Sequence, residues 1–205
     1  MRQPKVKGAG PGGGATVDVA FNNNRSIVAV HAADLHRLAN AVLSDGAASA
    51  PRSWGLGPNA TIVATICAND TAAAVLVAVL TATRSSTPKP SMFGDIAIVS
   101  SFATWAGLSR SARYDQNSYY AWVYGVLQHF DLPDLVATTS LLQPWVPRVL
   151  VLSPTDALRT RLPPKQAAKD FEFVLATQPR AVVDTNASTA ADIDRVLVQW
   201  LNNTQ

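Results

Sequence analysis

The pattern of apolar and polar positions is clearest between residues 61 and 80, and the rest of the chain is interpreted around it. A short β-branched run at 62–66 is followed by a turn of a few residues, 67–71. An unbroken apolar segment then extends over 72–80. An apolar strand, a tight turn and a helix of small apolar residues are typical of the centre of an α/β sheet.

Strand and helix patterns alternate along the rest of the chain. Apolar runs predict strands and amphipathic spacing predicts helices, whereas 26–30 fits either a short strand or the entry to a helix. The predicted strands are 15–20, 62–66, 95–100, 148–152 and 180–183. The predicted helices are 31–43, 72–80, 118–130, a short one beginning at Asp131-Leu-Pro133, 164–175 and 189–201, with 101–117 irregular. This alternation predicts the α/β class, with a mainly parallel sheet covered by helices on both faces.

The chain has 205 residues, which suits one domain with a sizeable core. Residues 1–14 are basic and rich in glycine, which predicts a flexible tail, and residues 15–205 are expected to form the domain. The tail does not fit a phosphate-binding loop, because no Gly-Lys-Ser/Thr ends it and no strand precedes it. No apolar run approaches the roughly 20 residues of a membrane span.

Composition bears on partners and compartment. Hydrophobic residues make up 48% of the chain and charged residues 15%, which fits either a surface covered by other protein chains or a large core rich in Ala and Val. The net charge is +3 and the basic residues form no stripe, so nucleic-acid contact is not indicated. Cys67 is the single cysteine, so an intracellular location is expected, with an organelle such as the mitochondrion as one option. No cofactor motif or metal-ligand spacing is present.

Three segments together resemble the α/β-hydrolase superfamily, in particular its acetyl-xylan-esterase and dienelactone-hydrolase-like branch. The first is the helical segment 32–43 that leads to the strand at 62–66. The second is His129-Phe-Asp-Leu-Pro-Asp-Leu135 followed by the strand and turn at 147–157, and the third is the closing strand and helix at 180–201. The resemblance extends from about residue 30 to residue 201 and implies a partial, N-terminally truncated α/β-hydrolase fold.

The resemblance also implies positions for a catalytic triad of nucleophile, base and acid. Only the acid position carries its usual residue type in this chain. The nucleophile motif of such hydrolases is Gly-x-Ser-x-Gly, whereas this chain has Asn69, or alternatively Cys67, at the nucleophile position, and Cys67 and Thr71 replace the glycines. Asp156 falls where the acid would lie. The loop at 185–189 has no histidine to act as the base, so we expect a catalytically inactive domain.

We therefore expect a structural or interaction subunit of a larger protein assembly, and two alternative functions remain open. Cys67 could be an unconventional nucleophile of an active esterase, with His31 or His36 as its base. Asn69 could hydrogen-bond a ligand in a small-molecule-binding module that uses the former pocket. Asp156 is interpreted mainly as a residue that accepts turn amides.

Other polar and aromatic residues are interpreted as structural. Asp131 and Asp134 are expected to start a helix, and His129 to cap or pack at a helix end. A dense group of aromatic residues fits either the core or a protein interface. Its members are Tyr114, Tyr119, Tyr120, Trp122 and Tyr124.

Overall fold

A computed structural model describes residues 26–44, 62, 64–82, 93–113, 115, 121, 123, 125–141 and 148–203. Three sequence predictions lie outside these residues: the tail at 1–14, the strand at 15–20 and the aromatic group around residues 114–124. No helix in the described part of the chain has both the length and the apolarity needed to span a bilayer.

In the described part of the chain, four parallel strands form the sheet, in the order β1 (Ala64–Ala68), β2 (Asp95–Val99), β3 (Val149–Leu152) and β4 (Ala181–Asp184). Each lies within two residues of a predicted strand. The two central strands, β2 and β3, are apolar along almost their whole length, because side chains on both of their faces are buried. The predicted α/β class with a parallel sheet is confirmed.

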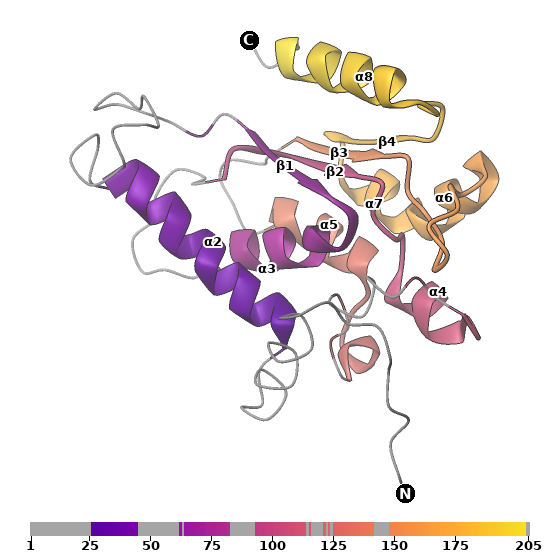
Figure 1. The fold of residues 1–205 in the computed structure, drawn as a ribbon, viewed down its shortest axis with the longest axis horizontal. Helices are drawn as coiled ribbons and strands as arrows, with labels where there is room; N and C mark the ends of the chain where they lie inside the picture. Colours follow the sequence, from indigo (N-terminus) through magenta and orange to yellow (C-terminus); the bar gives the residue numbers. More distant parts are fainter. Residues whose placement is uncertain are drawn as a thin grey trace, which may run out of the picture.

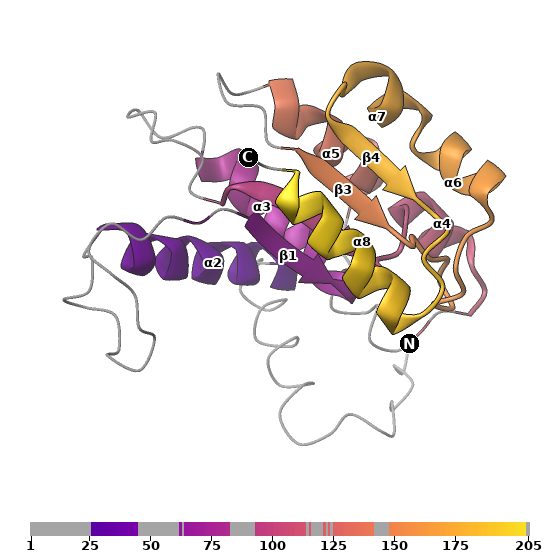
Figure 2. The same ribbon diagram turned by 90° about the horizontal axis from the view of Figure 1, so that it is seen from above.

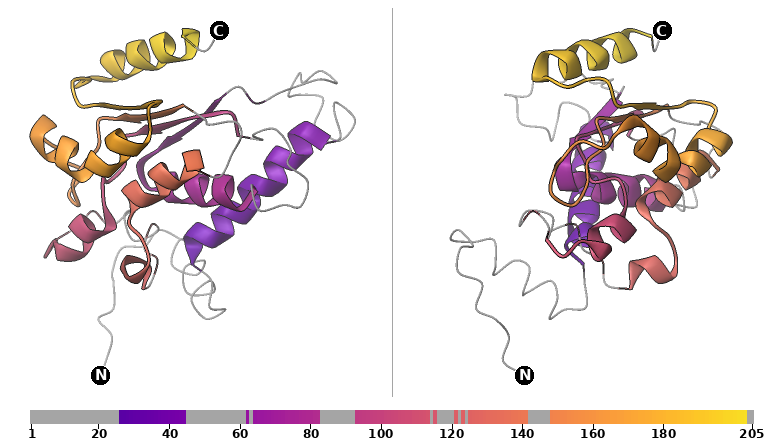
Figure 3. Two further views of the ribbon diagram at one scale, coloured as in Figure 1. Left: turned by 180° about the vertical axis from the view of Figure 1, so that it is seen from behind. Right: turned by 90° about the vertical axis from the view of Figure 1, so that its right-hand side faces the viewer.

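Helices cover both faces of this sheet (Figure 1). One face is covered by α8 (Ala190–Asn202), which lies over the middle of the sheet when seen from that side (Figure 2). The other is covered by α2 (Ile27–Ser44), α3 (Ala72–Ala82), α5 (Leu132–Leu141) and α7 (Glu172–Thr177), which contact one another in that order. The view from behind shows these four helices on the side of the sheet opposite α8 (Figure 3).

The central unit is β1, the single turn η3 (Asn69–Thr71) and α3, as the sequence predicts. Five successive residues of α3, from Ala72 to Leu76, are almost completely buried. A helix that is apolar all round belongs inside a protein, and small alanine side chains let it lie close to the sheet and to α2 and α5. The turn that follows β1 is therefore held in place on both sides by buried structure.

Some predicted boundaries differ from the structure. The segment 26–30 is the start of helix α2 and not a strand. The predicted helix at 164–175 is divided at Phe171 into α6 (Pro164–Asp170) and α7, because the backbone there leaves the helical region at φ −106°. Where the predicted helix at 118–130 is described, it is not an α-helix; the named element there is a short 3₁₀ turn, η5 (Val126–Gln128), which follows Gly125 at φ 73°.

Helix α4 (Trp105–Arg110) lies in a segment that the sequence predicts to be irregular, so that prediction is wrong. Two side chains satisfy the amides at its first turn. Thr104 Oγ1 accepts from the Gly107 amide at 2.8 Å, and the Asp131 carboxylate accepts from the amides of Trp105 and Ala106 at 2.6 and 3.0 Å. Asp131 also directly precedes α5 and accepts from the Leu132 amide, so one carboxylate supports the starts of two helices.

Helix α8 is fixed to the sheet by Arg148. Its guanidinium donates to Asp95 Oδ2 at 2.8 Å and to the carbonyl oxygens of Trp200 and Asn203 at 2.9 and 3.0 Å. The same group lies 4.8 Å from the centre of the Trp200 ring, within the range of a cation–π contact. Arg148 thus joins the start of β3, the start of β2 and the last turn of α8.

A capping box begins the same helix. Thr189 Oγ1 accepts from the Asp192 amide, and the Asp192 carboxylate accepts from the Thr189 amide and hydroxyl. The Thr189 side chain and backbone, and then the Ser188 backbone, lower the pKa of Asp192 from 3.8 to about 2.

We expect the stabilising charge of Asp192 to be lost in acid. Because its folded pKa is depressed, its contribution is present above the unfolded pKa near 4 and disappears as the pH falls through about 2. The unfolding temperatures of the wild type and of Asp192→Asn should therefore differ at neutral pH and converge over this range. A difference that stays constant down to the lowest pH would contradict this role.

Candidate functional site

The carboxyl ends of the parallel strands meet at one edge of the sheet, where the backbone adopts an unusual conformation. Asn69, Ser100 and Ser153 directly follow β1, β2 and β3, with φ of 55°, 50° and 51°. Arg159, in the loop after β3, has φ of 66°. Within the described residues, these four are the only ones other than glycine with positive φ. Non-glycine residues in this conformation cluster at binding and active sites.

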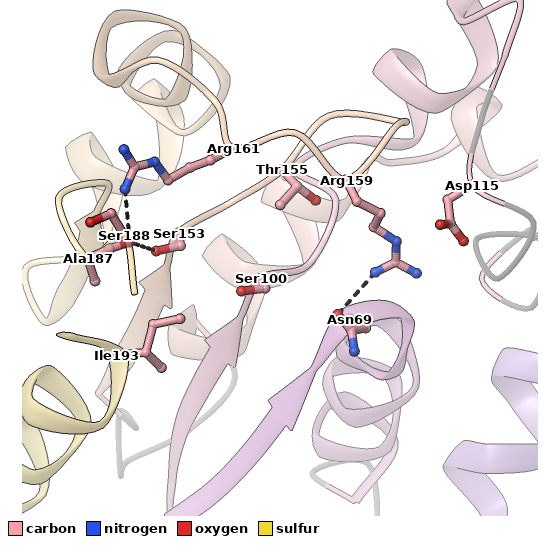
Figure 4. Close-up of a pocket in the computed structure, with 10 residues that line it drawn as sticks. All are labelled: Asn69, Ser100, Asp115, Ser153, Thr155, Arg159, Arg161, Ala187, Ser188 and Ile193. Carbon is pink, nitrogen blue, oxygen red and sulfur yellow. Dashed lines mark hydrogen bonds between the residues drawn. The ribbon is translucent and has the colours of Figure 1, made fainter. Parts of the chain in front are cut away.

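All four residues line one open cleft of about 490 Å³ (Figure 4). Most of its lining is polar. The lining residues are Asn69, Ser100, Asp115, Ser153, Thr155, Arg159, Arg161, Ala187, Ser188 and Ile193. In open α/β sheets, ligands bind outside the carboxyl ends of the strands, which is where this cleft lies.

Hydrogen bonds across the cleft hold its walls together. Arg159 Nη1 donates to Asn69 Oδ1 at 3.2 Å, which joins the loop after β3 to the turn after β1. The carbonyl oxygen of Ala187 accepts from Ser153 Oγ at 2.6 Å and from Arg161 Nη1 at 3.0 Å. These bonds fix the segment before α8 against the end of β3, so the cleft is built from contacts between distant parts of the sequence.

Thr155 is the one lining residue with a buried hydroxyl that has no partner in the structure. Its residue is only 6% exposed, and Oγ1 forms no hydrogen bond. Its backbone is fully used, since it bridges to Phe102 in parallel and to Arg161 in antiparallel fashion. Buried hydroxyl groups are normally hydrogen-bonded, so this oxygen is a specific feature of the cleft wall.

Of the residues singled out from the sequence, Asn69 lies in the cleft and Cys67 does not. Cys67 is buried on β1, and its thiol donates to the Ala97 carbonyl oxygen at 3.4 Å. Burial raises the pKa of the Cys67 thiol to about 12. A nucleophilic cysteine needs a lowered pKa and access to solvent, and Cys67 has neither.

We expect the Cys67 thiol of the folded protein to be inert to iodoacetamide at pH 8, where a pKa of about 12 leaves about one thiolate in ten thousand. Unfolding in guanidinium chloride should expose the side chain and allow complete alkylation, measured by mass spectrometry. Rapid alkylation of the folded protein, together with loss of an esterase activity, would restore Cys67 as a candidate nucleophile.

Asp156 lies near the cleft edge but outside its lining. Its Oδ1 accepts from the amides of Leu158 and Thr160 at 2.8 and 2.9 Å, the turn contacts expected from the sequence. These contacts bring the loop around so that Arg159 and Arg161 both reach the cleft. The carboxylate itself lines a smaller cavity of about 240 Å³ beside α4.

No histidine lines the cleft in the part of the chain that the structure describes. His36 is 2.7 Å from Thr81 Oγ1 and packs edge-on against Phe93, and His31 and His129 are exposed. In the segment where the resemblance would place a base, Ala187 and Ser188 line the cleft instead. Among the described residues, no cluster of three or more His, Cys, Asp or Glu could hold a metal ion.

Sequence reasoning did not identify Ser100, Ser153, Arg159 or Arg161 as site residues. One signal was present, because Ser100 ends one predicted buried strand and Ser153 directly follows another. Searches of protein-family models, curated proteins and solved structures found no match to this chain. The site is therefore interpreted from its own geometry and chemistry.

Proposed function

We propose that this chain is a catalytically inactive, α/β-hydrolase-like domain that binds a small polar molecule in the cleft at the carboxyl edge of its sheet. The observation that carries the proposal is that all four non-glycine residues with positive φ in the described structure line this one cleft. Strain of this kind persists only where the surrounding structure enforces it, and it concentrates at ligand sites.

The position of Asn69 supports the link to hydrolases. It lies in a tight turn between a buried strand and a buried helix, with φ of 55°, where an α/β-hydrolase presents its nucleophile. An asparagine amide has no proton that a base could remove to make a nucleophile, but it donates and accepts hydrogen bonds. The chemistry at this position therefore favours binding over covalent catalysis.

The absence of turnover is tested with p-nitrophenyl acetate and p-nitrophenyl butyrate. Hydrolysis by the purified chain should equal that of buffer, and Cys67→Ala and Asp156→Asn should leave it unchanged. Hydrolysis above the buffer rate that either variant abolishes would show that the chain is an esterase.

Binding in the cleft is tested with a chemically mixed library of small molecules, measured by saturation-transfer NMR. Ser188→Trp should abolish binding, because Ser188 is an exposed lining residue and an indole there fills the cleft. Ser109→Trp is the matched control, since Ser109 is an exposed serine on α4 outside the cleft lining. If no compound binds the wild type and Ser109→Trp but fails to bind Ser188→Trp, the proposal is wrong.

The exposed edge of β1 favours a second candidate function, that of a structural or interaction subunit in a protein assembly. In the described structure β1 pairs only with β2, and Ile66 on this edge strand is 51% exposed. An unpaired strand edge with apolar side chains is a template for pairing with another chain.

Light scattering after size exclusion separates this candidate from the first. An interaction subunit purified alone should self-associate, and Ile66→Lys should make it more soluble by placing a charge on the edge strand. A soluble monomer that binds small molecules in the cleft would favour the first candidate.

A further inference from the structure

We propose that the ligand of the cleft carries an anionic group, a carboxylate or a phosphate, that is bound by Arg161. This inference rests on the proposed function and specifies its ligand class. The lining contains two arginines and one aspartate, so its net charge is positive. Three observations support an anion: the distribution of these charges, the lack of a carboxylate partner for Arg161 in the described structure, and the unpartnered Thr155 hydroxyl.

The two ends of the cleft differ in charge. Figure 4 shows the Arg159 side chain extending toward Asn69, with Asp115 on the same side of the cleft. Arg161 lies at the other end, beside Ala187 and Ser188. The single carboxylate of the lining is therefore at the Arg159 end, and Arg161 is the charged lining residue at the other end.

Most of the guanidinium N–H donors of Arg161 form no hydrogen bond within the described structure. Its only hydrogen bond within the described structure is from Nη1 to the neutral carbonyl oxygen of Ala187, and it has no carboxylate partner there. A guanidinium has five N–H donors in a planar fork that matches a carboxylate or phosphate. The nearby Asp192 carboxylate is used in capping α8. The neutral carbonyl oxygen of Ala187 does not balance the positive charge of Arg161, and an anionic ligand group would.

Thr155 supplies the second, independent observation. Thr155 lines this cleft and also the smaller cavity beside α4, its buried Oγ1 has no hydrogen-bond partner in the described structure, and its backbone forms an antiparallel bridge with that of Arg161. A hydroxyl in this position gains its missing hydrogen bond when a polar ligand fills the cleft.

The size and polarity of the cleft limit the rest of the ligand. A volume of about 490 Å³ suits a molecule of metabolite size. Apart from Ala187 and Ile193, the lining is polar, with hydroxyls from Ser100, Ser153 and Ser188. The remainder of the ligand should therefore be hydrophilic.

Titration of the full chain with matched charged and neutral probes, followed by NMR, tests this inference. Gluconate and glycerol 3-phosphate provide a carboxylate and a phosphate, glucose and glycerol are their neutral counterparts, and inorganic phosphate tests the bare anion. At least one of the anionic probes should bind saturably, and the neutral probes should not. The anion that binds most tightly identifies which group the site prefers.

Two variants then assign the contacts. Arg161→Gln should weaken binding about tenfold or more, as expected for loss of a charge-assisted hydrogen bond, and Arg161→Lys should restore only part of the affinity. Arg110→Gln is the control, because Arg110 is exposed on α4 outside the cleft. Thr155→Val keeps the shape but removes the hydroxyl, so it should weaken binding without lowering the unfolding temperature.

The outcomes separate this inference from the proposed function. If neutral or cationic compounds bind and Ser188→Trp blocks them, while no anion binds, the cleft is a ligand site but the anion inference is wrong. If Arg161→Gln and Arg110→Gln weaken anion binding equally, the effect is one of overall charge and Arg161 has no specific role. If Ser188→Trp blocks no compound of any class, both proposals are wrong.

Discussion

Replacing Arg148 with alanine is expected to lower the free energy of unfolding by about 2–4 kcal/mol. The Arg148 side chain is only 20% exposed, and its loss leaves Asp95 without its ion-pair partner and the Trp200 and Asn203 carbonyl oxygens without their donor. Arg148→Lys keeps the charge but not the fork of donors, so an intermediate loss is expected. Chemical denaturation followed by circular dichroism measures both.

Arg37→Ala is the matched control for this prediction. Arg37 is also paired with an aspartate at 2.9 Å, but its side chain is 80% exposed, so its removal should change stability by about 0.5 kcal/mol or less. Equal losses for Arg148→Ala and Arg37→Ala would contradict the role of Arg148. Because Arg148 holds α8, and the segment before α8 forms one wall of the cleft, Arg148→Ala should also weaken ligand binding.

Phe171→Ala is expected to have the largest effect, about 3–5 kcal/mol, because it empties a site in the core between α6 and α7. Phe171 is 1% exposed and belongs to the main hydrophobic cluster, whereas Phe173, two residues later, is 54% exposed. Phe173→Ala should therefore change stability by about 0.5 kcal/mol or less. Thermal or urea unfolding of the two variants measures the difference, and similar losses for the two would contradict the core role of Phe171.

The sequence predicts the sheet well, because burial dictates its pattern. The run Val149–Leu152 and the apolar positions of β2 read as buried strands without any tertiary information. The unit of β1, its turn and α3 follows for the same reason, with Asn69 in the turn.

Elements that depend on contacts between distant residues could not be predicted in the same way. Helix α4 begins where the Asp131 carboxylate, 26 and 25 residues away in sequence, accepts its first amides. The break between α6 and α7 lies at Phe171, whose side chain is buried in the main core cluster, and helical periodicity does not show it. The local sequence pattern therefore indicates neither the start of α4 nor the break at Phe171.

The candidate site was partly predictable for a related reason. Asn69 and Asp156 were singled out because the resemblance to α/β-hydrolases implies a nucleophile position and an acid position there. Arg159 lies within the turn that Asp156 closes and Arg161 directly follows it, and both line the cleft. The positive φ of Ser100 and Ser153 is invisible in a sequence, since serine does not mark a left-handed backbone as glycine does.

The most direct test of a non-catalytic binding site at the sheet edge is a map of ligand-induced shifts on the backbone amides. The ¹⁵N-labelled chain is titrated with the compound that binds most tightly in the library screen. The account predicts saturable shifts that are largest at Asn69, Ser100, Ser153 and Arg159, with the compound recovered unchanged. Shifts concentrated along the outer edge of β1, or conversion of the compound during the titration, would contradict it.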